Sequence, residues 1–104
     1  MAKYLLLATS QAKPGREDEY NHWYDTNHLR DVCAVPGITS GRRFEADPRS
    51  PARPDADCIA LYEIDTDDPT TVFTELQRRA QTGEMTLTDA LDYSSAKLML
   101  FRFR

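Results

Sequence analysis

Apolar runs and amphipathic stretches alternate along this chain of 104 residues. Residues 3–9 and 58–64 are nearly continuous apolar runs, which is typical of strands that are covered on both faces. Residues 38–46 and 96–103 also read as strands, in which successive side chains point to opposite faces. The pattern therefore predicts four strands, with 3–9 in the middle of their sheet.

This alternation assigns the side chains of two strands to faces. In strand 38–46, one face is expected to carry Ile38, Ser40, Arg42 and Phe44, and the other Thr39, Gly41, Arg43 and Glu45. In strand 96–103, Leu98 and Leu100 are expected on one side, and Met99, Phe101 and Phe103 on the other. Arg42 and Arg43 thus point in opposite directions, so only one of them can line a pocket on the helix side of the sheet.

A spacing of three and four residues predicts a first helix after Pro14 and Gly15. Its first turn is acidic, which suits the positive end of the helix dipole. One broad face, expected to be buried, carries Tyr20, Trp23, Tyr24 and His28, with Val32 and Val35 further along. The dipeptide Pro36-Gly37 ends this helix.

A second helix is predicted to begin at Asp68 and Pro69, a capping residue followed by proline in the first turn, and to end near Gly83. Its apolar face consists of Val72, Phe73, Leu76 and Ala80. Residues 47–57 contain three prolines among charged residues, a composition that predicts an exposed, mobile loop.

The resulting order, β-α-β-β-α-β, is that of a ferredoxin-like α+β fold, a four-stranded antiparallel sheet with two helices on one face. Residues 1–104 are expected to form a single domain. Because the strands are apolar on both sides and the helices cover only one face, the open face needs another cover. The simplest is a second copy of the chain, so we expect a homodimer that forms through the open sheet face.

Composition narrows the classes of partner. The chain is 40% hydrophobic and 10% aromatic, which argues against disorder, and its net charge of −4 gives no basic stripe for nucleic acid. The apolar run near the N-terminus is too short for a membrane span or a secretory signal, so we expect a cytoplasmic protein without a membrane partner. Cys33 and Cys58 lie in different elements and match no metal-binding spacing, and both are expected to be buried thiols.

The segment 21–29 concentrates reactive side chains. His28 is a candidate general base, because histidine takes up and returns a proton near neutral pH. Asp25, one turn earlier, is expected to bind a ring nitrogen of His28 and fix its tautomer. Tyr24 is a candidate donor to an oxyanion that develops on a substrate. We name His28, Asp25 and Tyr24 as the candidate catalytic residues.

Other residues are candidates for binding a hydrophobic small molecule. Trp23 offers a flat wall for a planar ligand, and an arginine on the helix side of the second strand could bind an anionic oxygen. The full set of binding candidates is Trp23, Tyr20, Asn27, Arg43 and Tyr62. His22 lies half a turn away from His28 on the helix, so the two do not converge on one ion; we expect neither a metal site nor a cofactor.

These residues resemble a known family. The run from Glu19 to Leu29, followed by Val35-Pro36-Gly37 and Arg42-Arg43-Phe44, is similar to the signature of the dimeric α+β barrel superfamily, above all to its small EthD-like proteins. That superfamily includes cofactorless quinone-forming monooxygenases, polyketide cyclases, lactone isomerases and haem enzymes. Related sequences commonly have proline soon after the His-Leu pair, where this chain has Arg30. The resemblance implies the fold and a dimer more than any one reaction.

Two functions follow as hypotheses. The first is a cofactor-independent enzyme of the monooxygenase, cyclase or isomerase type that acts on an aromatic or polyketide-like molecule, with His28 as general base. The second is a non-catalytic dimeric binding or accessory protein, in which the same aromatic residues form a pocket or only a core. A haem protein with His28 as ligand is a weaker alternative, because one histidine is little evidence for haem.

Overall fold

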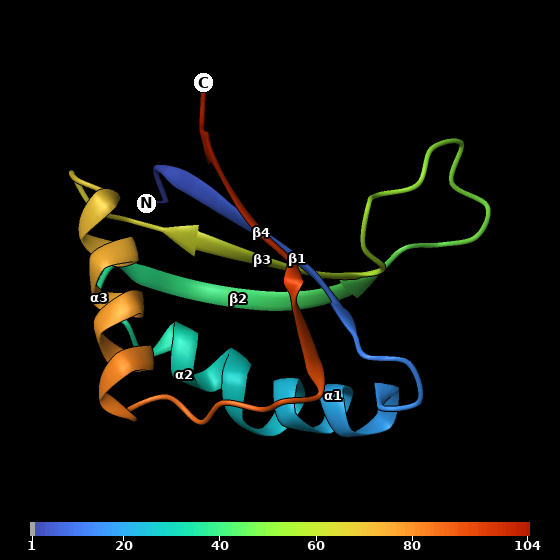
Figure 1. Ribbon diagram of the computed structural model, residues 1–104. Coiled ribbons are helices and arrows are strands. Elements are labelled where there is room, and N and C mark those ends of the chain that lie inside the picture. Colours follow the sequence, from blue (N-terminus) through green and yellow to red (C-terminus); the bar gives the residue numbers. More distant parts are fainter. Residues whose placement is uncertain (1) are drawn as a thin grey trace.

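The computed structural model describes residues 2–104, and its elements follow the predicted order (Figure 1). From the N-terminus they are β1 (Tyr4–Ala12), α1 (Glu17–Trp23), the π-helical turn η1 (Tyr24–His28), α2 (Leu29–Cys33), β2 (Ile38–Glu45), β3 (Cys58–Ile64), α3 (Thr70–Thr82) and β4 (Leu91–Arg102). Because α1, η1 and α2 follow one another without a break, they make one long helix. The order β-α-β-β-α-β is confirmed.

The four strands form one antiparallel sheet in the order β2-β3-β1-β4. β1 is therefore a central strand, as predicted. In this sheet Leu6 of β1 lies between Tyr62 of β3 and Leu100 of β4. Both helices lie on the same side of the sheet in Figure 1, so the ferredoxin-like α+β fold is confirmed.

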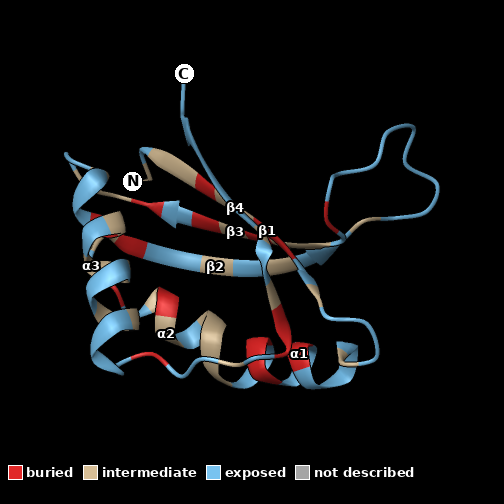
Figure 2. Ribbon diagram, viewed as in Figure 1, coloured by how far each residue is buried: buried red, intermediate tan, exposed pale blue. Residues whose placement is uncertain are grey.

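The core lies between the sheet and the helices. Side chains of alternate strand residues point into it from the sheet, and helix and connection residues fill it from the other side. The largest fully buried side chains of this core are Tyr20, Tyr62, Leu6, Ile64, Val35 and Val72. Figure 2 shows buried residues on the sheet and on the helix sides that face it. The predicted apolar face of the first helix is confirmed, because Tyr20, Trp23 and Tyr24 are all buried.

The predicted faces of β2 hold from Ser40 onward but fail at its start. Arg43 pairs with Ala60 and Arg42 with Leu61, so the two arginines point to opposite faces of the sheet. The register shifts between Ile38 and Ser40, and Ile38 is buried in the core. The expectation that Ile38 shares a face with Ser40 was wrong, because an irregularity in a strand breaks its strict alternation.

The π-helical turn changes the geometry of the long helix. Trp23 and His28 are five positions apart, and at about 3.6 residues per turn an α-helix would not stack such a pair. The wider turn over Tyr24–His28 brings the His28 ring onto the Trp23 ring, with centroids 4.4 Å apart and planes inclined by 21°. The helix runs on through Arg30, so no break occurs where related sequences have proline.

The second helix, α3, ends where predicted and begins at Thr70, one residue after the predicted first helical position, Pro69. The Asp68 carboxylate accepts hydrogen bonds from the Thr70 backbone N–H and hydroxyl, at 3.0 and 2.6 Å, and so caps the first turn. Gly83 ends the helix in the left-handed conformation with φ 81°. This helix lies at the end of the sheet where β3 ends, and the loop 47–57 lies at the opposite end (Figure 1).

The other face of the sheet has no cover within residues 2–104. Its side chains include Leu5 and Leu7 of β1 and Ile59 and Leu61 of β3, all half-buried. Larger apolar side chains on this face are open to solvent: Phe44 is 43% exposed, Met99 40% and Phe101 49%. A surface of this kind is typical of an interface.

Most of the loop 47–57 is exposed as expected, although Ala56 is buried.

Candidate functional site

A cavity of about 340 Å³ lies between the sheet and the helices. Most of its wall is apolar and comes from three parts of the chain. The sheet provides Leu6, Ala8 and Leu98, the helices provide Val32, Phe73, Leu76 and Ala80, and the connection after α3 provides Met85 and Leu87. The polar residues of the wall are Tyr24, His28, Tyr62, Gln77 and Tyr93. Aspartate, glutamate, lysine and arginine are absent from the described residues of this wall.

His28 is held in place by aromatic rings. It stacks on Trp23 and meets Tyr24 edge-on, with ring centroids 4.8 Å apart and planes inclined by 88°. Burial lowers the pKa of His28 from 6.5 to about 4, and the positive charge of Arg43 acts in the same direction, against the nearby Asp31 carboxylate. His28 is therefore neutral at pH 7. Its Nδ1 is buried and has no hydrogen-bond partner among residues 2–104.

Two tyrosine hydroxyls meet in the cavity wall. The hydroxyl oxygens of Tyr24 and Tyr62 are 3.1 Å apart, so one hydroxyl donates to the other. Burial raises the pKa of both phenols, which keeps both protonated at neutral pH. A pair of hydroxyls that shares one hydrogen bond retains one O–H that can donate elsewhere.

Asp25 does not contact His28, contrary to our expectation. Its carboxylate accepts a hydrogen bond from Nη1 of Arg43 at 2.7 Å. The wide turn of η1 explains the difference, because residues three apart do not lie above one another when a turn contains more residues than in an α-helix. The carboxylate that acts on the charge of His28 is Asp31, which itself accepts a hydrogen bond from the Thr86 N–H at 3.1 Å.

Arg43 lies on the helix side of the sheet, behind Tyr24. Its guanidinium carbon is 4.5 Å from the centroid of the Tyr24 ring and 5.8 Å from that of Tyr20. Nη2 donates to the Asn21 side-chain oxygen at 2.9 Å, while Nε is buried and has no partner within the described range 2–104. Arg43 therefore does not line the apolar cavity; the Tyr24 ring stands between the two.

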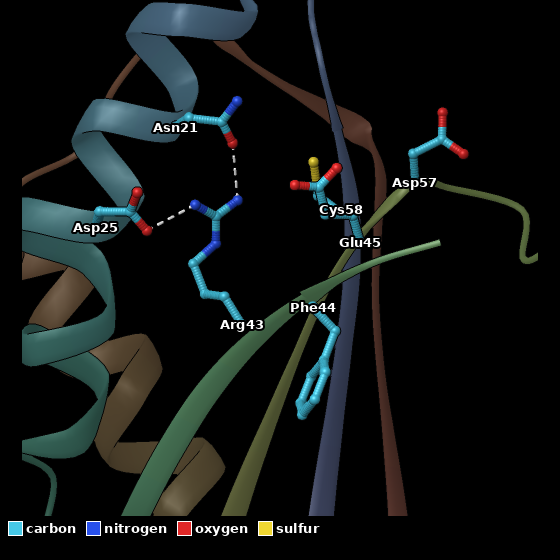
Figure 3. Close-up of a pocket in the computed structure, with 7 residues that line it drawn as sticks. All are labelled: Asn21, Asp25, Arg43, Phe44, Glu45, Asp57 and Cys58. Carbon is cyan, nitrogen blue, oxygen red and sulfur yellow. Dashed lines mark hydrogen bonds and ion pairs between the residues drawn. The ribbon is translucent and has the colours of Figure 1, made fainter. Parts of the chain in front are cut away.

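Arg43 instead lines a second, polar cavity of about 400 Å³ at the end of β2. Figure 3 shows Arg43 pointing to the helix that carries Asn21 and Asp25, whereas Phe44 points to the other side of the sheet. The rest of the wall is formed by Glu45, Asp57 and Cys58. This cavity is dominated by carboxylates, and its one cation, among the residues that the structure places there, is already paired.

Three other binding candidates have structural contacts outside the apolar cavity. Trp23 donates from Nε1 to the Thr86 carbonyl oxygen at 2.7 Å, and its ring supports His28 from behind. Tyr20 is fully buried and shares a hydrogen bond of 2.6 Å with Ser10. Asn27 donates to the Thr26 hydroxyl at 3.1 Å on the exposed side of the helix. Of the candidates, the cavity brings together His28, Tyr24 and Tyr62.

Sequence reasoning missed much of the cavity wall. Phe73, Leu76 and Ala80 were recognised only as the apolar face of a helix, which gives no sign that part of this face borders a cavity. Met85 and Leu87 lie in a connection without regular spacing, held to the long helix through both backbone groups of Thr86. Only the packing of α3 and this connection over the sheet could show them.

Two further properties concern residues 2–104 as a whole. No group of three or more histidine, cysteine, aspartate or glutamate side chains in this range is placed to hold a metal ion. None of the helices there is both long enough and apolar enough to cross a membrane.

Comparisons with known proteins bear on the fold. No protein-family model matches the chain, and a search of curated proteins finds no match. Among solved structures, an EthD family protein from Bacillus halodurans superposes with a TM-score of 0.64 at 13% identity, covering 98% of this chain and 99% of the other. The haem degrader MhuD from Mycobacterium tuberculosis, solved with two haems in its active site, has a TM-score of 0.64 at 11% identity, covering 96% and 94%.

Both superpositions cover nearly the whole of each chain, so they compare complete folds rather than shared motifs. At such low identity they carry no residue's role from those proteins to this one. They do agree with the resemblance that the segment 19–44 suggested. The chain therefore has the ferredoxin-like α+β fold shared by EthD-like proteins and the haem degrader MhuD.

Proposed function

We propose that this protein takes up a hydrophobic, planar small molecule in the apolar cavity, with His28 as the polar centre that meets it. The observation that carries this proposal is a neutral, half-buried histidine in an otherwise mostly apolar wall, beside the Tyr24 and Tyr62 hydroxyls. A cavity of about 340 Å³ is within the usual range for small-molecule sites, and such sites combine apolar walls with a few polar groups.

The same arrangement supports a cofactor-independent enzyme of the monooxygenase, cyclase or isomerase type. Tyr24 or Tyr62 would donate a hydrogen bond to an oxygen that gains negative charge. Asp25 would act through Arg43, whose charge lies against the Tyr24 ring. General-base catalysis by His28 would need a proton on Nδ1, and Nδ1 has no acceptor in the structure.

A haem fits this cavity poorly. Haem carries two carboxylates as well as its iron, and no lysine or arginine lines the apolar cavity to pair with them. His28 would be available as an iron ligand, but the polar end of the group would meet an apolar wall. The lining of the cavity therefore does not favour haem as its ligand.

We further propose that two copies associate through the open face of the sheet. The exposed apolar side chains Phe44, Met99 and Phe101 lie on this face, on the side away from the helices. Association would remove these side chains from water, and each Å² of apolar surface buried in this way stabilises the dimer by about 25 cal/mol. The cavity lies on the opposite side of the sheet, so each copy would retain its own.

Ligand uptake can be measured through Trp23, the only tryptophan of the chain, whose ring stacks on His28. We expect 1-tetralone, a neutral bicyclic ketone, to change the fluorescence of Trp23 in a saturable way. Ala80→Phe, which places a ring in the cavity, should weaken this binding at least tenfold. Ala52→Phe, in the exposed loop, should leave it unchanged and serves as the matched control.

Equal binding by wild type and Ala80→Phe would show that the ligand binds elsewhere, and the proposal would then be abandoned. Absence of saturable binding by the wild type to 1-tetralone or to naphthalene would count against it in the same way. Circular dichroism of both variants would confirm that each is folded.

A further inference from the structure

The two ring nitrogens of His28 have different surroundings. Nδ1 is enclosed by protein and has no hydrogen-bond partner among the residues that the structure describes. Nε2 is not enclosed in this way, and it forms no hydrogen bond with any residue in the described part of the chain. Because His28 lines the apolar cavity, Nε2 is the nitrogen that a ligand there can reach.

Neutral imidazole carries one N–H and one bare nitrogen, so the proton is on either Nδ1 or Nε2. A proton on Nδ1 would bury an N–H donor without an acceptor, which is unfavourable, and buried donors without a partner are rarer than buried acceptors without one. A proton on Nε2 leaves only an unused lone pair in the enclosed position and places the donor where a ligand can use it. The tautomer with the proton on Nε2 is therefore favoured.

Neighbouring carboxylates do not reverse this preference. The Asp25 carboxylate is bound to Arg43 at 2.7 Å. The Asp31 carboxylate accepts the Thr86 N–H at 3.1 Å, and neither of its oxygens is hydrogen-bonded to His28. A proton on Nδ1 is usually fixed by a hydrogen-bond acceptor, such as a carboxylate or a backbone carbonyl. The described residues provide no such acceptor for His28.

We infer that His28 presents Nε2–H to the cavity as a hydrogen-bond donor, and that the cavity binds an uncharged hydrophobic carbonyl compound, such as a cyclic ketone, enone or quinone, through its oxygen. This inference rests on the proposed function. The remaining O–H of the Tyr24–Tyr62 pair is a second donor in the same wall, so the polar groups match an acceptor oxygen. The uncharged character of the ligand follows from a wall that contains no aspartate, glutamate, lysine or arginine among the described residues and whose histidine is neutral.

This inference changes the role that spacing suggested for His28. As a donor, His28 would stabilise negative charge that builds up on the carbonyl oxygen, while the tyrosine pair adds to the same effect. The O–H of a phenol would gain no acceptor from His28 in this tautomer, because the unprotonated nitrogen is the enclosed Nδ1. The site is built to polarise a carbonyl group.

The tautomer can be observed directly. In uniformly ¹⁵N-labelled protein at pH 7, long-range ¹H–¹⁵N correlations of the imidazole ring distinguish Nε2–H from Nδ1–H. His28→Phe, which keeps a ring on Trp23, assigns the signals by removing one set, and the exposed His22 remains as an internal reference. We expect His28 to show the Nε2–H pattern. The Nδ1–H pattern would overturn the inference, whatever the cavity binds.

A matched pair of ligands tests the carbonyl preference. Isothermal titration calorimetry measures the affinities of wild type and His28→Phe for 1-tetralone and for naphthalene, which has no polar atom. We expect His28→Phe to bind 1-tetralone roughly two- to tenfold more weakly than the wild type does, the effect of one hydrogen bond, and to bind naphthalene equally well. An equal change for both ligands would overturn the donor role. If the wild type binds neither, the proposed function fails, while the NMR result still decides which nitrogen carries the proton.

Discussion

At the scale of single residues, Asp25 and His28 are three positions apart on one helix, yet they belong to different groups of contacts. Asp25 reaches Arg43 and the polar cavity, whereas His28 is packed between Trp23 and Tyr24 beside the apolar cavity. The types of residue in segment 21–29 suggested acid–base chemistry, and this suggestion stays a prediction. The contacts determine which of these side chains can meet a ligand.

The pH dependence of stability tests the environment of His28. Its pKa is about 4 in the folded protein, below the ordinary value of 6.5 that applies after unfolding. Between these values the unfolded chain binds the proton and the folded one does not, so stability falls as the pH falls from 6.5 towards 4. We expect His28→Phe to lack this loss, which is on the order of 2 kcal/mol.

Urea unfolding of wild type and His28→Phe at pH 7 and pH 4.5 measures this difference. Carboxylates with lowered pKa, such as Glu75 between Arg78 and Arg79, also titrate at low pH but do so in both proteins. The difference between the two proteins therefore isolates His28. If wild type and variant lose the same free energy on acidification, His28 titrates normally and is not buried as described.

At the scale of elements, the approach of the long helix to β2 depends on Gly41. This residue faces the helices, and a Cβ atom there would be 2.6 Å from Cδ1 of Tyr62 and 2.7 Å from Sγ of Cys33. The absence of a side chain thus allows Tyr62 to lie flat across β2, where its hydroxyl reaches that of Tyr24. A strand residue without a side chain is commonly found where another group packs closely.

Gly41→Ala should lower the free energy of unfolding by about 1–3 kcal/mol, the usual cost of overpacking. It should also weaken binding of 1-tetralone, because Tyr62 must move. Ser40→Ala, at the preceding position on the open face, is the control and should change neither quantity by much. Chemical denaturation and the Trp23 fluorescence titration give both values. Unchanged stability of Gly41→Ala would show that the helix does not pack as closely as described.

At the scale of the whole molecule, the two faces of the sheet have different surroundings. One face is covered by the helices and borders the cavity, while the other presents Phe44, Met99 and Phe101 to solvent. In an isolated monomer, this second face would remain exposed to solvent. The proposed homodimer would cover it, and would place the cavities of the two copies on the outer sides of the paired sheets.

Size-exclusion chromatography with light scattering tests this association. We expect the wild type to be a dimer, and Phe101→Lys to be largely monomeric, because a buried, unpaired lysine in the interface is unfavourable. Leu87→Lys changes an equally exposed side chain, 52% against 49%, that lies beside the cavity instead of on the open face. It should leave the dimer intact. A monomeric wild type would contradict the proposed interface.

The order of elements could be predicted from the sequence because it depends on local chemistry. Alternation of apolar residues, the Pro36-Gly37 break, the Asp68 cap and Gly83 each act over a few residues, and their consequences appear in the structure. The buried aromatic face of the first helix was predictable for the same reason. A periodic apolar face has to be covered, whatever packs on it.

Tertiary structure decided which of these residues meet in a site. The π-helical turn rotates His28 onto Trp23 and separates it from Asp25, and no local signal in the sequence indicated that turn. The irregularity at the start of β2 turns Ile38 into the core, and α3 with its following connection closes the cavity. These features are set by contacts between segments that are distant in the sequence. They depend on how the helices pack on the sheet, which the spacing of residues along the chain does not determine.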